Sequence, residues 1–296
     1  PGRRGGSHIV TEASRLPSAS SWQDMRLGPD FSRPRLEMCG GAMWHNAPHR
    51  VCETPMGMIN AIGLQNPGVT QVVDAILPTL DFDETRFIAN VSGSTVEEYI
   101  DVTRYFDDSP IDAIEINISC PNIKEGSALF GTCLESFRRV VDGVRRKTRL
   151  PLIPKLAPNV TDIVAIARAV EAEGADAVSL INTITGMAID VNTRRPKLAN
   201  ITGGLSGPAI RPVAVRMVWQ VAQAVSIPVI GIGGIMTAED ALEFLIAGAA
   251  AVQIGTANFV KPHATTDIID GIEMFLMQKK IDRVADIIGT LETEHQ

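Results

Sequence analysis

Residues 112–122 have the sequence DAIEINISCPN, in which an apolar run leads directly into polar residues and a proline. Asp112 to Ile116 predicts a strand buried on both faces, as is typical of parallel sheets. Pro121 ends the run and leaves Cys120 on a loop, where an α/β barrel displays its chemistry. A cysteine can act as a base or nucleophile once its pKa of about 8.5 is lowered. Taken alone, Cys120 is more simply a small apolar residue in a turn.

Six short apolar runs in all predict buried parallel strands. They are Phe87–Val91, Ala113–Ile118, Leu152–Leu156, Ala177–Ile181, Val229–Ile232 and Ala251–Ile254. Pro154 is expected to mark a bulge or a strand end. Amphipathic stretches lie between the runs: Thr161 to Glu173 predicts a helix that stops at Gly174, and Thr237 to Asp240 predicts a capped start for a helix ending near Gly248.

A sequence echo supports repeated strand–helix units. Gly174 to Val178 and Gly248 to Val252 both place Gly-Ala at an expected helix end directly before a strand. The two copies are separated by about two units of roughly 30–40 residues each, the unit size of a (β/α)₈ barrel. The echo favours a (β/α)₈ TIM barrel over a doubly wound sheet, which could use the same units.

The N-terminal segment does not continue this pattern. Residues 1–34 are rich in Arg, Ser, Gly and Pro, and only His8 to Glu12 and Leu36 to Trp44 are candidates for the two remaining strands. We therefore expect an atypical segment over 1–48, disordered or foreign to the barrel, and a barrel domain over 49–296. The segment has no apolar core of about 7–15 residues, so we do not expect a signal peptide.

Composition excludes several classes of function. The chain of 296 residues is 45% hydrophobic and has a net charge of −7, without a basic block. Nucleic acid is therefore not an expected partner, and no apolar run approaches the roughly 20 residues that span a membrane. The 4 cysteines form no CxxC pair and have no histidine at metal-ligand spacing. We expect unpaired thiols, no metal and a cytoplasmic location.

Three glycine-rich turns follow the late strands. They are Gly203–Pro208, Gly231–Ile235 and Gly255–Thr256. Glycine lets backbone N–H groups surround an anion, and the loops after strands seven and eight of a barrel commonly hold phosphate. The turns therefore predict a cofactor that carries a phosphate group.

A lysine and a set of asparagines complete the candidate site. Lys155 falls in a predicted buried strand, where it is either a paired core lysine, a strand-end residue or a cation that stabilises a reduced flavin. The asparagines share a position at or near strand ends or on loops: Asn60, Asn90, Asn117, Asn122 and Asn182. Each alone is more often a turn residue, but together they could hold a flat ring rich in carbonyl and N–H groups.

With these residues in place, the chain resembles the class 1 dihydroorotate dehydrogenases, and within them the NAD-linked 1B catalytic subunits. The similarity runs in register from about residue 49 to 285. It is carried by Glu53–Pro55, Asn60–Gly68, Asn117–Asn122, Lys155–Asn159, Ile181–Thr183, Gly203–Pro208, Gly233–Gly234 and Gly255–Thr256. The resemblance implies a (β/α)₈ barrel with FMN at its C-terminal mouth.

The resemblance also implies a role for each residue. Cys120 matches the base that removes the C5 proton of dihydroorotate while a hydride passes from C6 to FMN N5. The positions that match substrate contacts are Asn60, Ala61, Ile62, Gly63, Leu64, Asn117, Asn182 and Thr183. Those that match FMN contacts are Asn90, Asn117, Lys155, Ile181, Gly207, Gly233, Gly234, Gly255 and Thr256, the last four at the phosphate. Residues 123–130 match a mobile lid.

The 1B type implies a partner subunit carrying FAD and a [2Fe–2S] cluster, through which electrons reach NAD⁺. This chain has no cysteine cluster able to ligate iron–sulfur, so we expect a homodimeric catalytic core within a heterotetramer. The first 48 residues depart from the family, because they contain no lysine where the family has one that contacts FMN and substrate.

Three hypotheses follow. The first is FMN-dependent oxidation of (S)-dihydroorotate to orotate in pyrimidine biosynthesis. The second is a dihydropyrimidine dehydrogenase-type subunit that acts on uracil or thymine. The third is a non-catalytic barrel remnant without a complete FMN site, which the departure over residues 1–48 supports.

Overall fold

The computed structural model describes residues 9–11, 46–83, 85–118 and 134–293. Its main sheet has seven parallel strands in the order β1-β13-β12-β7-β6-β5-β4. Their bounds are β1 Ile9–Thr11, β4 Ile88–Val91, β5 Ala113–Asn117, β6 Leu152–Leu156, β7 Val178–Leu180, β12 Val229–Ile232 and β13 Ala251–Ile254. All six predicted strands are present, and one strand of the sheet falls within the weak candidate His8 to Glu12. The other candidate, Leu36 to Trp44, lies outside the described residues.

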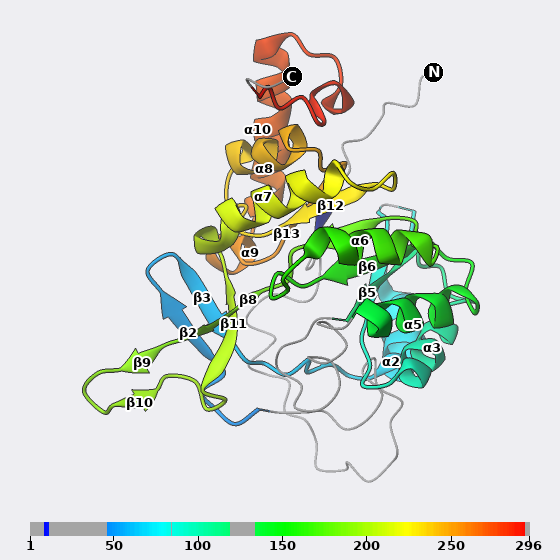
Figure 1. Ribbon diagram of the computed structural model, residues 1–296, viewed down its shortest axis with the longest axis vertical. Coiled ribbons are helices and arrows are strands. Elements are labelled where there is room, and N and C mark those ends of the chain that lie inside the picture. The colour runs from blue at the N-terminus through cyan, green and yellow to red at the C-terminus, as the bar shows by residue number, and fades with distance from the viewer. Residues whose placement is uncertain (1–8, 12–45, 84, 119–133, 294–296) are drawn as a thin grey trace.

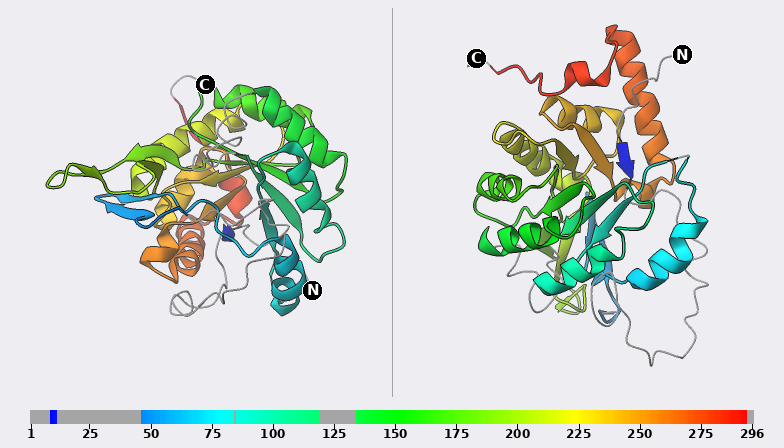
Figure 2. Two further views of the ribbon diagram at one scale, coloured as in Figure 1. Left: turned by 90° about the horizontal axis from the view of Figure 1, so that it is seen from below. Right: turned by 90° about the vertical axis from the view of Figure 1, so that its right-hand side faces the viewer.

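Helices alternate with these strands and cover the outer side of the curled sheet (Figures 1 and 2). They are α3 Val96–Arg104, α5 Leu134–Arg145, α6 Ile163–Ala172, α7 Arg211–Ala222 and α8 Ala238–Ile246, with α10 Ala264–Lys279 packed against α8. Shorter segments are α2 Val69–Gln71, η1 Val72–Ile76, η2 Leu77–Thr79, η3 Pro208–Ile210, α9 Ala257–Val260 and η4 Val284–Ile287. The fold is that of a (β/α)₈ barrel, and within the described residues β1 and β4 are the two edges of its sheet.

Complete burial explains why the strands are mostly apolar. Every residue of β5 and of β6 is buried, because one face packs on the helices and the other faces the barrel interior. Pro154 corrects one expectation, since it lies inside β6 in register with Ile116 of β5. The carbonyls of Leu152 and Leu156 face β7, so alternation turns residue 154 the same way. The proline therefore withholds only an N–H on the side of β7, and pairing with β7 begins at Lys155.

The helix ends follow the sequence echo. Gly174 and Gly248 both adopt positive φ, of 89° and 117°, and each ends a helix in the left-handed turn that glycine favours. In both copies the next residue donates its N–H back into the helix, Ala175 to Val170 and Ala249 to Phe244. The capped start at Thr237 is also confirmed, because Thr237 and Asp240 form a reciprocal capping box at the start of α8.

A second sheet, which periodicity did not predict, lies beside the barrel (Figure 1). It is antiparallel, in the order β2-β3-β11-β8, with bounds β2 Val51–Thr54, β3 Gly57–Asn60, β8 Ile184–Met187 and β11 Thr202–Ser206. The stretch Gly203–Pro208, expected as part of a connection, thus provides most of β11. A hairpin of β9 (Ile189–Asp190) and β10 (Arg195–Pro196) follows β8, and together with Met187 at the end of β8 it forms a projecting arm.

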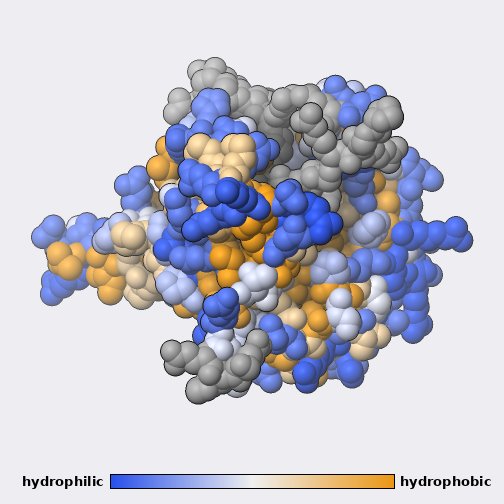
Figure 3. All heavy atoms as spheres, turned by 90° about the horizontal axis from the view of Figure 1, so that it is seen from above, coloured by the Kyte–Doolittle hydropathy of each residue, from blue (hydrophilic) through white to orange (hydrophobic). Residues whose placement is uncertain are grey.

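The arm exposes apolar side chains. Met187, Ile189 and Val191 are among the exposed large hydrophobic residues, and Val191 is 80% exposed. Figure 3 shows hydrophobic residues along this arm and in the middle of the face seen from above, between hydrophilic groups. None of the helices in the described part of the chain is long and apolar enough to cross a membrane.

Candidate functional site

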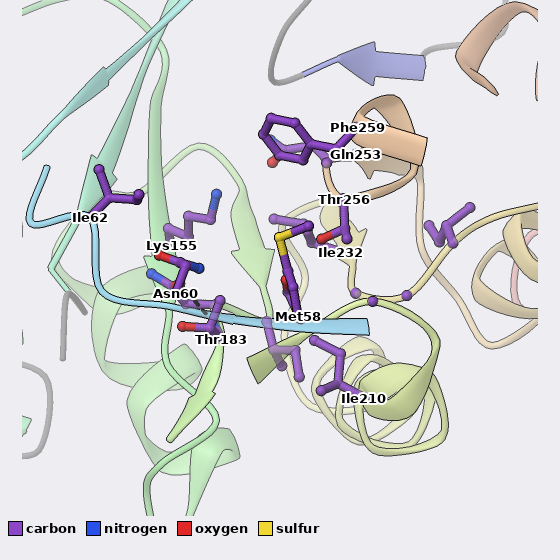
Figure 4. Close-up of a pocket in the computed structure, with 18 of the residues that line it drawn as sticks. Met58, Asn60, Ile62, Lys155, Thr183, Ile210, Ile232, Gln253, Thr256 and Phe259 are labelled. Carbon is purple, nitrogen blue, oxygen red and sulfur yellow. Dashed lines mark hydrogen bonds between the residues drawn. The ribbon is translucent and has the colours of Figure 1, made fainter. Parts of the chain in front are cut away.

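A cavity of about 430 Å³ lies where the second sheet meets the C-terminal ends of the barrel strands (Figure 4). Its volume is within the range of small-molecule sites. The side chains come from β3 (Met58, Asn60), from the end of β6 (Lys155) and from the ends of β12 and β13 (Ile232, Gln253). The carboxyl ends of strands are where barrels bind their ligands, so the second sheet forms one wall of the expected binding mouth.

Most of the residues predicted for the site meet in this cavity. Those that line it are Asn60, Ile62, Lys155, Ile181, Asn182, Thr183, Gly207, Gly233, Gly234, Gly255 and Thr256. They come from segments spread over almost 200 residues of sequence. The cavity therefore joins the glycine-rich turns at one end to the lysine and amide residues at the other.

The glycine end is built so closely that side chains would not fit. Gly233 and Gly234 have φ of 133° and 74°, values that side-chain-bearing residues rarely adopt. A Cβ on Gly234 would lie 2.7 Å from the carbonyl oxygen of Gly207 and 2.9 Å from Cβ of Arg211. Bare backbone at this end can approach an anion, which is the property a phosphate group requires.

An ion pair holds the loop around this end. Arg211, at the start of α7, pairs with Asp240 of α8. Asp240 also accepts hydrogen bonds from the backbone N–H groups of Met236 (2.8 Å) and Thr237 (3.0 Å). Because the guanidinium already faces a buried carboxylate, a phosphate at this end would be bound chiefly by backbone N–H groups.

The opposite end carries amide and hydroxyl groups. Asn60 donates to the carbonyl of Gly204 at 3.4 Å, which joins β3 to β11. The N–H of Thr183 donates to Oδ1 of Asn182 at 2.7 Å. A Cβ on Gly204 would collide with the Thr183 side chain, so glycine in β11 gives this threonine its place. The arrangement presents neutral donors and acceptors, which suit a flat polar ring.

Lys155 is buried below these groups, as a paired core lysine. Its Nζ lies 3.4 Å from Oε2 of Glu115, and the two residues are only 4% and 2% exposed. Glu115 Oε1 accepts from Ser179 Oγ at 2.7 Å and from Gln253 Nε2 at 2.9 Å. Buried charges need such pairing and hydrogen bonding to be tolerated. Lys155 thus brings a positive charge to the cavity together with its counter-charge.

Two predicted residues lie behind the cavity. Asn182 donates to Oδ1 of Asn117 at 3.1 Å, Asn117 to Oδ1 of Asn90 at 3.5 Å, and Asn90 to Oε2 of Glu115 at 2.5 Å. Asn90 and Asn117 are not among the lining residues, although they connect to Asn182, which is. They therefore support the site from behind, through Asn182.

The remaining predicted residues either lie next to the cavity without lining it or fall outside the described residues. Ala61, Gly63 and Leu64 follow β3 next to the lining residues Asn60 and Ile62 but do not line the cavity themselves. Cys120, Asn122 and the lid segment 123–130 lie outside the described residues. Within the described ranges no group of three His, Cys, Asp or Glu side chains could hold a metal ion.

The sequence analysis missed two kinds of site residue. The apolar lining residues Val51, Met58, Ile210 and Phe259 had no distinguishing signal, whereas Ser206, Ile232 and Ile235 lie within the predicted glycine-rich turns. Glu115 and Gln253 had one, because each is a polar residue between two apolar neighbours inside a buried strand. A buried polar group needs partners, and this requirement could have linked both residues to Lys155.

The cavity fits the FMN that the family resemblance implies. Its glycine end has the bare backbone that phosphate binding needs. Its middle is apolar, with Met58, Ile181 and Ile232 among its walls, and the other end provides Lys155 and the amides for a polar ring. These features agree with a flat aromatic ligand that ends in a phosphate.

Comparisons with known proteins agree with this site. The family model for dihydroorotate dehydrogenase matches residues 43–276. A protein of Geotalea uraniireducens named dihydroorotate dehydrogenase B (NAD(+)), catalytic subunit, is 56% identical over 249 residues, which cover 84% of this chain and 82% of the relative. The protein with the same name from Porphyromonas gingivalis is 54% identical over 251 residues, 84% of this chain and 82% of the relative. The chain therefore belongs to the dihydroorotate dehydrogenase family, in which it is similar to catalytic subunits of the NAD(+)-linked type.

Proposed function

We propose that this chain oxidises (S)-dihydroorotate to orotate with FMN as its cofactor, as a step of pyrimidine biosynthesis. The observation that carries the proposal is the single cavity that joins a bare glycine end to Lys155 and an amide-lined end. The names of the relatives support the same substrate. The cavity alone would also suit another pyrimidine, so the names favour dihydroorotate over uracil or thymine.

Each end of the cavity has a proposed task. The backbone of Gly233, Gly234, Gly255 and Thr256 would bind the phosphate of FMN, with Gly207 beside it, and Lys155 would place its ammonium group near the ring. Asn60, Asn182 and Thr183 would orient the pyrimidine ring of the substrate through its carbonyl and N–H groups. FMN, when bound, supplies the acceptor for the hydride that leaves C6.

Cys120 is the proposed general base. Its thiolate would take the proton from C5 of the substrate, so that both electrons of the C6–H bond can leave as hydride and a C5–C6 double bond forms. The role comes from the family resemblance. It is supported by the position of Cys120 three residues after Asn117, which ends β5 next to Asn182.

We further propose that the electrons pass to NAD⁺ through a partner subunit that carries FAD and a [2Fe–2S] cluster. The names of the relatives, catalytic subunits of an NAD(+)-linked enzyme, support the partner. A homodimeric core within a heterotetramer is part of this proposal. The apolar residues of the projecting arm, Met187, Ile189 and Val191, support a protein–protein contact of this chain.

An anaerobic visible spectrum of the purified chain tests the proposal, recorded before and after dihydroorotate is added. A flavin spectrum that bleaches with dihydroorotate, and not with dihydrouracil or dihydrothymine, is the expected result. Bleaching by dihydrouracil or dihydrothymine alone would favour the dihydropyrimidine dehydrogenase type. A chain that stays colourless after incubation with FMN would contradict the proposal and leave the non-catalytic barrel.

A further inference from the structure

The barrel interior contains a carboxylate to which no task has been given so far. Glu115 lies in the middle of β5 and is 2% exposed. It accepts hydrogen bonds from side chains of four other strands: Asn90 on β4, Lys155 on β6, Ser179 on β7 and Gln253 on β13. Two of these four donors, Lys155 and Gln253, line the cavity.

All four partners present hydrogen-bond donors to this carboxyl group. Asn90 and Lys155 donate to Oε2, and Ser179 and Gln253 donate to Oε1. An ionised carboxylate can only accept, which matches this set, whereas a neutral carboxyl or an amide would turn a donor toward another donor. The surroundings therefore require a negative charge at Glu115, and that charge offsets the positive charge of Lys155 beside the cavity.

The same requirement determines the direction of a chain of amides. Asn90 must turn its NH₂ toward Glu115, which leaves its Oδ1 to accept from Asn117 at 3.5 Å. Asn117 then offers its Oδ1 to Asn182 at 3.1 Å. The Oδ1 of Asn182 consequently faces the N–H of Thr183, from which it accepts at 2.7 Å. Each amide has the orientation that the charge at Glu115 demands.

We propose that Glu115 is a positioning residue of this site, which acts on the ammonium group of Lys155 and on the side-chain amide of Asn182. Through Lys155 it sets how much positive charge the flavin ring experiences. Through Asn90 and Asn117 it fixes the orientation of the Asn182 amide, and so the directions in which its NH₂ and its oxygen point beside the substrate. The inference rests on the proposed flavin function. A polarised hydrogen-bonded network in a low-dielectric interior transmits such an orientation well.

The test is the variant Glu115→Gln, studied as the FMN-loaded chain. Removing the negative charge deprives Lys155 of this counter-charge and raises the positive potential at the cavity, which favours the reduced, anionic flavin. We expect the midpoint potential of bound FMN, measured spectroelectrochemically, to rise enough to change the ratio of reduced to oxidised flavin about 10-fold, or about 30 mV for two electrons. The Michaelis constant for dihydroorotate should rise about 2- to 10-fold, as for one lost hydrogen bond.

Ser179→Ala is the matched control, because it removes one neutral donor to the same carboxylate and does not line the cavity. It should leave the midpoint potential and the Michaelis constant near their wild-type values. Glu115→Asp, which keeps the charge, should keep a potential closer to wild type than Glu115→Gln does. If Glu115 had a merely structural role, all three variants would lose thermal stability while their midpoint potentials stayed unchanged.

If Glu115→Gln does not fold, Lys155→Met with and without Glu115→Gln replaces it. The double variant must have a higher midpoint potential than Lys155→Met alone, because only the latter retains the buried negative charge. Equal midpoint potentials in wild type and Glu115→Gln, or in Lys155→Met and the double variant where that pair replaces them, would overturn the inference. A wild-type chain that bleaches with dihydroorotate while the variants show no shift contradicts the inference alone, whereas a wild-type chain without bound flavin contradicts the proposed function as well.

Discussion

At the scale of single residues, the site depends on groups that sequence patterns separate poorly from ordinary core residues. Lys155 has the paired-lysine environment expected of a core position, with Glu115 at 3.4 Å, and also lines the cavity. The structure confirms the paired core lysine, and its place at the cavity supports the proposed role beside the flavin ring. A buried ion pair contributes little net stability compared with apolar packing, so a role at the cavity gives a reason for its presence.

The proposed base gives a sharp prediction. Cys120→Ala should leave FMN binding intact but slow the reduction of bound flavin by dihydroorotate about 10²- to 10⁴-fold, the usual contribution of general-base catalysis. Stopped-flow absorbance of the flavin under anaerobic conditions measures this rate. Cys120→Ser should be active only at elevated pH, because a hydroxyl is a far weaker base than a thiolate.

Cys52 provides the control for this substitution. It lies on β2, is half-buried and does not line the cavity. Cys52→Ala should therefore reduce its flavin at the wild-type rate. A Cys120→Ala variant that is as fast as Cys52→Ala would show that the proton leaves C5 by another route.

Glu115 and Gln253 show what single-residue interpretation could have recovered. Each is a polar residue between two apolar neighbours inside a buried strand, and burial of such a side chain demands a partner. Their partners lie on other strands. Glu115 and Gln253 are hydrogen-bonded to each other, yet they are 138 residues apart in the sequence. Only the closure of the sheet brings them together, so local patterns flag both residues but do not pair them.

At the scale of elements, the loop after β12 gives the second prediction. Gly234→Ala introduces a Cβ at φ 74°, 2.7 Å from the carbonyl of Gly207. The left-handed conformation alone costs a side-chain-bearing residue about 1–2 kcal/mol, and the loop must also move from its neighbour. We expect FMN to bind about 10-fold more weakly or worse, as measured by fluorescence quenching of the free flavin.

Gly186→Ala is the matched change outside this loop. Gly186 lies in β8, and an added Cβ would be 3.5 Å from Cβ of Leu205, an ordinary contact. Its FMN affinity should stay near that of the wild type. Equal affinity in both alanine variants would contradict the assignment of the phosphate to the loop of Gly233 and Gly234.

The projecting hairpin gives a prediction that depends on pH. Hydrogen bonds from the backbone N–H groups of Thr193 and Asn192 hold the pKa of Asp190 below its ordinary value of 3.8. Because the folded chain lowers this pKa, the stabilisation is present above the ordinary value and is lost as the pH falls through the lowered one. NMR titration should show the amide protons of Asn192 and Thr193 shifting together with a midpoint below the ordinary pKa of 3.8, and Asp190→Asn should abolish that shift. A midpoint above the ordinary value would contradict the assigned cause.

The elements of the barrel were predictable from sequence, whereas the second sheet was not. β6, β12 and β13 have the predicted bounds because complete burial produces short, mostly apolar runs. β3 and β11 contain glycine and show mixed burial, and β3 pairs with residues more than 140 positions away. Strand preference depends on such neighbours, so no local signal announced this wall of the cavity.

At the scale of the whole molecule, the cavity is the place where both sheets meet. Its lining includes Met58 and Asn60 of β3, Ser206 of β11, Lys155 of β6 and Gln253 of β13. A ligand that fills the cavity contacts both sheets, and no strand of one sheet is hydrogen-bonded in a ladder to a strand of the other. The bound cofactor is therefore expected to act as a structural link between the barrel and the antiparallel sheet, in addition to its chemical role.

This link gives the last prediction, a thermal stabilisation of the whole chain by its cofactor. A ligand that binds only the folded state stabilises it by about 2.7 kcal/mol at 100 times its Kd, which corresponds to a rise in Tm of roughly 5 °C for a chain of this size. Differential scanning calorimetry of the flavin-free chain with added FMN measures the rise. Riboflavin, which lacks the phosphate, is the matched ligand. It should stabilise the chain less at the same concentration, because it cannot use the backbone N–H groups of Gly233, Gly234 and Gly255. Equal shifts with both ligands would mean that the glycine end does not bind phosphate, and no shift with either would mean that the cavity does not bind flavin.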